Sequence, residues 1–140
     1  MELNKFKELM KTNIYDVSNT IVIVGSCVKN MQPQGFEKIK IISNNIYEIC
    51  MEETHINMAI TKIAGMLRTG KIENLIFASV DKSPHCIQLH YIQDELRKIM
   101  DIKKVNIKNY VIVDNELEEI KPEIISLSKN LSELKKFLNN

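Results

Sequence analysis

The sequence predicts a single three-layer α/β domain with a mainly parallel, Rossmann-like sheet and an antiparallel β-hairpin at one edge. Three apolar runs indicate buried strands, at residues 20–25, 75–80 and 110–113. Each run is too short for a helix and lacks polar alternation, which is typical of a strand covered on both faces. Because amphipathic helical segments separate the runs, a parallel sheet with helical crossovers is favoured. The 140 residues suffice for one core but not comfortably for two.

The hairpin is predicted between residues 38 and 51. Two strand-like runs, 38–42 and 46–51, flank Ser43-Asn44-Asn45, and asparagine tolerates the left-handed backbone of a tight turn. A second turn signal, Asp114-Asn115, precedes a short return strand at 117–120.

Four helices are predicted from apolar residues at helical spacing. The first covers residues 3–10, and the second begins after Thr54 as its cap and stops at Gly70. The third runs from 85 to 100, with Ser83 as N-cap and Pro84 at the first helical position. The last covers residues 122–138.

Composition excludes several classes of function. The net charge is +1 with balanced signs, so no field would attract nucleic acid or an anionic membrane. No apolar run approaches the roughly 18–20 residues of a membrane-spanning helix. The three cysteines, an odd number in a chain of ordinary core size, argue against a secreted disulfide framework. We therefore expect a cytoplasmic protein with reduced thiols.

Two loops are the candidate ligand site. Gly25, Ser26 and Cys27 follow the first strand, and Asp81, Lys82 and Ser83 follow the strand at 75–80. In open α/β sheets, ligands bind outside the carboxyl ends of the strands, so we expect these loops to converge. A small anion would suit the free amides of the helix that follows, with Lys82 adding charge. Neither GxGxxG nor GxxxxGK is present, which removes the simplest nucleotide-binding interpretations.

Cys86, His85 and His90 are the candidate catalytic residues. On the predicted helix Cys86 lies in the first turn, where free amides and the dipole favour a thiolate. His90 lies four residues further, on the same face, as a proton-transfer partner. Cys27, Cys86 and His90 are also candidate ligands for zinc or iron. The plainer alternative is that Cys86 is a small buried hydrophobe.

A second metal hypothesis involves Cys50, Glu53 and His55, which have suitable side chains but no recognised spacing.

A cysteine after one strand and a His/Cys pair after another is similar to the zinc-holding loops of β-class carbonic anhydrases. Where that family has Cys-x-Asp-x-Arg, residues 27–31 read Cys-Val-Lys-Asn-Met. Where the family has His-x-x-Cys, His85 and Cys86 are adjacent, and adjacent helical residues project about 100° apart. The resemblance therefore implies a common architecture without a shared activity.

Two functions remain open at this point. The first is a small α/β protein that binds an anionic or thiol-reactive ligand, or a metal, at the two loops. The second is a non-catalytic interaction or accessory subunit of a larger redox assembly, or a homodimer, using the hairpin edge and the terminal helices. The residues do not decide whether the protein is an enzyme.

Overall fold

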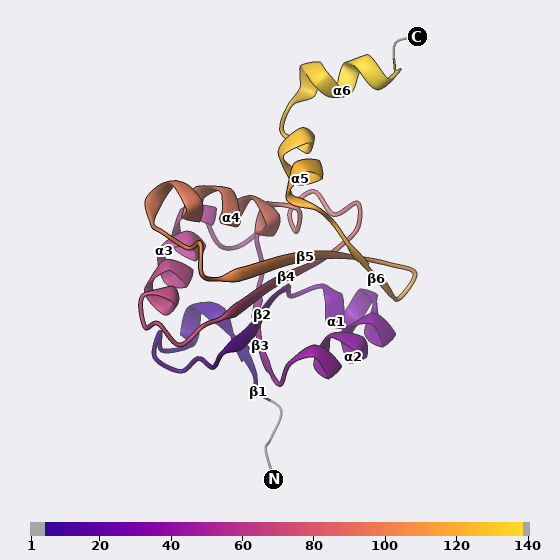
Figure 1. Ribbon diagram of the computed structural model, residues 1–140. Coiled ribbons are helices and arrows are strands. Elements are labelled where there is room, and N and C mark those ends of the chain that lie inside the picture. The colour runs from indigo at the N-terminus through magenta and orange to yellow at the C-terminus, as the bar shows by residue number, and fades with distance from the viewer. Residues whose placement is uncertain (1–4, 139–140) are drawn as a thin grey trace.

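The computed structural model describes residues 5–138, and its six strands form one sheet (Figure 1). The strand order is β1-β3-β2-β4-β5-β6, with all neighbours parallel except the antiparallel β5–β6 pair. The strands are β1 (Lys5–Glu8), β2 (Thr20–Gly25), β3 (Asn45–Ile49), β4 (Asn74–Val80), β5 (Asn106–Val113) and β6 (Glu116–Glu119). The helices are α1 (Val28–Met31), α2 (Pro33–Ile42), α3 (Ile56–Leu67), α4 (Gln88–Ile99), α5 (Pro122–Ser128) and α6 (Leu131–Leu138), and a 3₁₀ turn covers Leu9–Lys11.

Helices cover both faces of the sheet, as a three-layer domain requires. Figure 1 shows α3 and α4 on one face and α1 and α2 on the other. The larger core cluster joins Ile21, Ile23 and Phe77 to α3 and α4. The smaller joins Val22 and Val24 to α2. The two clusters use alternate residues of β2, so this strand is buried on both faces, and the predicted mainly parallel α/β fold is confirmed.

The predicted strand at residues 38–42 is wrong, because this segment is the second half of α2. Pro33 occupies the start of that helix, and Phe36 and Ile39, three residues apart, point into the core. Residues 45–49 then form an interior strand between β1 and β2, parallel to both. The helix between β2 and β3 therefore makes a parallel crossover and not a hairpin.

The antiparallel hairpin is instead formed by β5 and β6, and β6 is the edge strand of the sheet. Asp114 and Asn115 form its turn with φ angles of 50° and 65°, as a two-residue hairpin loop requires. The Asn115 side chain also accepts hydrogen bonds from the Gln34 and Gly35 amides at 3.1 Å, so the turn caps α2.

The predicted first helix is also wrong over its described part. Residues 5–8 are β1, and a single 3₁₀ turn places Leu9 in the core. Residues 3 and 4 of that prediction lie outside the described part of the chain.

The predicted last helix is two helices, α5 and α6. Asn130 interrupts it: its side chain accepts from the Glu133 amide, and its carbonyl accepts from the Leu134 amide. Asn130 therefore acts as a new N-terminal cap. None of the helices described between residues 5 and 138 is long and apolar enough to cross a lipid bilayer.

Candidate functional site

The candidate site lies where the chain leaves β2 and β4 toward opposite faces of the sheet. β2 continues into α1 and α2 on one face, whereas β4 continues toward α4 on the other (Figure 1). These two strands are hydrogen-bonded neighbours, with Val24 opposite Ala78. Their exit loops therefore begin at the same edge of the sheet and then turn to opposite faces. This is a topological switch point, the usual ligand position in open α/β sheets.

Two thiols meet at this point. The Sγ atoms of Cys27 and Cys86 are 3.1 Å apart, although 59 residues separate them in the chain. Gly25 makes this approach possible, because a Cβ atom at that position would lie 2.6 Å from the Cys86 Sγ. The space that a glycine often leaves for a phosphate is thus occupied by a thiol of the same chain.

Burial favours the neutral form of Cys27. Desolvation and the hydrogen bond with Cys86 raise the pKa of Cys27 from 9.0 to about 12. Cys50, which follows β3, is close enough to raise the pKa of Cys27 further through its charge. Cys27 is therefore a protonated thiol at neutral pH.

The helix start predicted at Pro84 is wrong by four residues, since α4 begins at Gln88. Ser83 still caps the preceding turn, because its hydroxyl accepts from the Cys86 amide at 3.2 Å. The amides of Ile87, Gln88 and Leu89 donate to carbonyls of the same segment. These donors are consequently already used, which weakens the expected anion site at the start of this helix.

The other loop residues are held by the backbone. Ser26 donates its amide to Ile49 of the neighbouring strand at 2.9 Å. Asp81 donates its amide to Ile112 at 3.2 Å, and Lys82 adopts a left-handed φ of 71°. Ser26 and Asp81 are half-buried and Lys82 is exposed, so their side chains remain available to a ligand.

His90 does not join the thiols. It is buried between β4 and β5, where Nδ1 is 2.9 Å from the Asn109 Oδ1 and Nε2 is 2.7 Å from the Ser79 Oγ. Asn109 Nδ2 donates to Gln93 Oε1, which also accepts from the Arg97 guanidinium. Because guanidinium groups only donate, this chain of bonds makes His90 donate through Nδ1 and accept from Ser79 through Nε2. Burial lowers the pKa of His90, so the neutral ring is favoured.

The two metal hypotheses are corrected by this arrangement. Between residues 5 and 138, no three His, Cys, Asp or Glu side chains are placed to hold a metal ion. The trio of Cys27, Cys86 and His90 is divided, since both ring nitrogens of His90 have partners elsewhere. In the second group, His55 caps α3 by accepting from the Asn57 amide, so the cap predicted at Thr54 is wrong by one residue.

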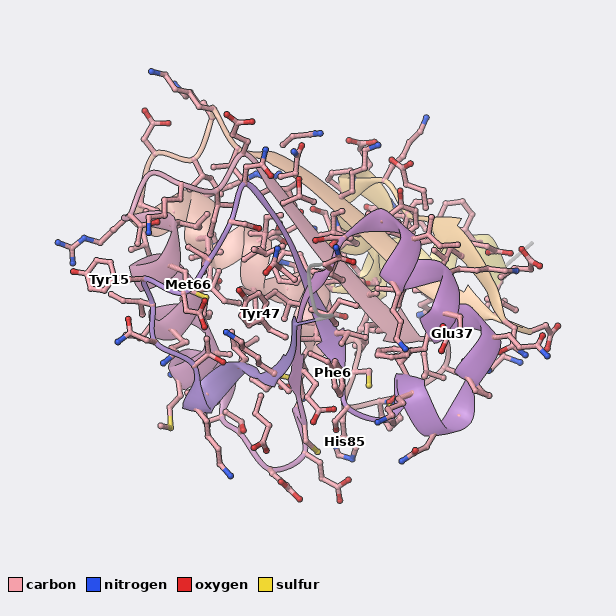
Figure 2. All side chains as sticks on the ribbon, turned by 90° about the horizontal axis from the view of Figure 1, so that it is seen from below. Phe6, Tyr15, Glu37, Tyr47, Met66 and His85 are labelled. Carbon is pink, nitrogen blue, oxygen red and sulfur yellow. The ribbon has the colours of Figure 1, made fainter. Side chains whose placement is uncertain are left out.

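A polar hollow adjoins the loops after β3 and β4. Its volume is about 470 Å³, and its lining includes Glu52, His55 and Gln88. His85 Nε2 lies 4.0 Å from a Glu52 carboxylate oxygen, and Figure 2 shows His85 at the periphery of the molecule. Neither Glu52 nor Gln88 belongs to a sequence motif, and only the fold brings the loop after β3 next to the start of α4.

Comparison with known families is consistent with this switch-point geometry. A model of the Rossmann-like domain family matches residues 17–139. The chain belongs to this family. No curated protein and no solved structure matches it. Membership supports the general α/β fold of this Rossmann-like domain, while its ligand must be argued from the side chains at the switch point.

The first prediction concerns Gly25. Replacing Gly25 by Ala would push the new methyl group into the Cys86 thiol, and we expect a loss of about 1–3 kcal/mol in the free energy of unfolding. In a Cys86→Ala background the same change should cost less by at least about 0.5 kcal/mol, because the clashing sulfur is gone. Urea denaturation of the four proteins measures this coupling. Strictly additive costs would contradict the packing argument.

The second prediction concerns the pH dependence of stability from His90. Its folded pKa is lowered, so the unfolded chain binds more protons, and stability is lost as the pH falls below the unfolded value of about 6.5. His90→Gln should reduce that loss and should cost about 1–3 kcal/mol near pH 8, because Ser79 and Asn109 lose a partner. Urea denaturation near pH 8 and near pH 5 measures both effects.

His85→Gln provides the control, because this exposed histidine lies outside the buried network of Ser79, His90 and Asn109. Equal pH dependence in wild type and His90→Gln would rule out the buried, neutral ring.

Proposed function

We propose that this Rossmann-like domain binds a small thiol-reactive ligand in the cytoplasm, at the switch point between β2 and β4, through the Cys27–Cys86 thiol pair. The approach of the two sulfurs to 3.1 Å is the observation that supports it. The Gly25, Ser26 and Cys27 loop lies on one side of the ligand. Asp81, Lys82 and Ser83 lie on the other.

A thiol-reactive ligand is favoured over a purely anionic one because the hydrogen-bond donors before α4 are already used. An anion needs free N–H groups or cations, and the amides of residues 86–89 are bonded within their own segment. Lys82 supplies one cation at the rim. Two sulfurs, in contrast, are already side by side, so a ligand that bonds to both needs little rearrangement of the protein.

In this proposal Cys86 acts through its sulfur together with Cys27, and His85 is the proton-transfer group. His85 is exposed and lies beside the Glu52 carboxylate. Because His85 directly precedes Cys86 in the chain and its ring is exposed, we assign proton transfer to this imidazole.

Phenylarsine oxide is the probe that tests this proposal. The trivalent arsenic bonds to two neighbouring sulfurs, and the two thiol protons leave with the arsenic-bound oxygen as water. We expect one arsenical per chain by intact-mass spectrometry, a loss of most binding in Cys27→Ser and in Cys86→Ser, and unchanged binding in Cys50→Ser. Binding that survives in Cys86→Ser, or that needs Cys50, would contradict the assignment.

A second candidate function, an interaction subunit, is favoured by α6. No residue of this helix is buried, and Leu131, Phe137 and Leu138 are 77%, 69% and 86% exposed. α5 is docked through the Tyr91–Ser128 and Asp94–Lys129 contacts, whereas α6 extends away from the body (Figure 1). A second copy is the partner we propose, because antiparallel pairing places Glu133 of one helix near the lysines at 135 and 136 of the other.

Sedimentation velocity tests this pairing. We expect a concentration-dependent dimer for the wild type and a shift to monomer in the Leu131→Lys/Phe137→Lys variant. Ile41→Lys is the matched control, since Ile41 is 85% exposed on α2 and should leave the dimer intact. A wild type that stays monomeric at all concentrations, or an equal effect of the control, would rule out the α6 contact.

A further inference from the structure

We propose that Cys27 and Cys86 form a reversible intrachain disulfide, so that the switch point is a two-electron redox couple that exchanges with low-molecular-weight disulfides. The inference rests on the thiol pair proposed above as the ligand site, but it concerns a bond between the two sulfurs and requires no bound ligand.

The geometry needs only a small adjustment. A disulfide bond is about 2.05 Å long, and the Sγ atoms are 3.1 Å apart, so closing the bond takes a movement of about 1 Å. Both sulfurs are on loops and not inside a strand or helix. Gly25 has no Cβ atom to crowd the Cys86 Sγ.

The exposure of the two thiols sets the order of events. Cys27 is half-buried, whereas Cys86 is only 5% exposed. An external disulfide therefore reaches Cys27 first. Cys86 is positioned to attack the resulting mixed disulfide, since its sulfur is already in contact with that of Cys27.

The exchange is balanced in atoms and electrons. Cys27 loses its proton and attacks one sulfur of the external disulfide, whose S–S bond breaks and releases a first thiolate. Cys86 loses its proton and attacks the Cys27 sulfur, which forms the internal S–S bond and releases the second thiolate. The two released thiolates take up two protons, so the protein is oxidised by two electrons and the external disulfide is reduced to two thiols.

Desolvation of the reduced pair supports a stable oxidised form. Burial and the contact with Cys86 raise the pKa of Cys27, so its thiolate does not stabilise the reduced state. A cysteine pair whose reduced form is stabilised by a thiolate is a strong oxidant. Cys27 and Cys86 lack that stabilisation, so their disulfide is a weak oxidant. The same high pKa makes the first attack slow at neutral pH and faster as the pH rises.

Cys50 is the internal competitor. It follows β3, next to the loop that carries Cys27, and it affects the pKa of Cys27. No hydrogen bond between Cys50 and either thiol is found among the described residues, whereas Cys27 and Cys86 are in contact. The geometry therefore assigns the bond to Cys27 and Cys86.

The test uses the full chain, reduced and then equilibrated in glutathione buffers that run from fully reduced to fully oxidised. Remaining thiols are blocked with N-ethylmaleimide and counted by intact mass. As the buffer becomes oxidising, Cys50→Ser should pass from two blocked thiols to none, and its mass should show no attached glutathione. Reduction should restore both thiols. Cys27→Ser should react little, while Cys86→Ser should stop at a mixed disulfide with glutathione.

Two outcomes would overturn the inference. One is that Cys50→Ser keeps two free thiols in fully oxidised glutathione, and the other is that peptide mapping of the wild type finds Cys27 joined to Cys50. Phenylarsine oxide separates this failure from that of the proposed function. A Cys50→Ser protein that binds the arsenical but forms no disulfide retains the ligand site and loses only the redox couple. A Cys50→Ser protein that forms the disulfide but does not bind the arsenical retains the redox couple and loses only the ligand site.

Discussion

The contact between the Cys86 thiol and Gly25 fixes the geometry on which the candidate site depends. β2 is apolar on both faces, with Ile21 and Ile23 in one core cluster and Val22 and Val24 in the other. A one-residue slip of such a strand exchanges similar side chains, so burial alone specifies its register weakly. Gly25 removes this ambiguity, since a slip would bring a larger side chain against the Cys86 sulfur. Packing at the end of the strand thus positions both the sheet and the thiols.

The sequence was sufficient to predict which loops converge, but not which side chains meet there. Strands 20–25 and 75–80 are apolar runs, and the rule for parallel sheets then brings their exits together. Cys86 and His90 were placed on one helical face because the helix was assumed to begin at Pro84. The segment before α4 instead has i to i+3 bonds from Gln88 and Leu89, a tighter turn that changes the direction of Cys86 relative to α4. That change of direction separates the Cys86 thiol from the His90 imidazole, which bonds to Ser79 and Asn109.

The fold errors arise where local pattern and tertiary contacts disagree. Residues 38–41 alternate Lys and Ile, which imitates a half-buried strand. The helix prevails because Phe36 and Ile39 bury one face and because Asn115, about 80 residues away in sequence, caps its first turn. No local pattern contains that cap. The short β1 is likewise stabilised by pairing with β3, whose position in the sheet depends on the α2 crossover.

The ligand and the internal disulfide make opposite demands on the same two sulfurs. A ligand that bonds to both gains from their proximity, because the second bond forms within the complex at high effective concentration. A single external thiol or electrophile lacks this advantage and faces a Cys27 that is protonated at neutral pH. Oxidation of the pair removes both sulfurs from the ligand. Binding and oxidation therefore exclude each other, so a ligand held by both thiols would protect the pair from external disulfides, and an oxidising environment would empty the site.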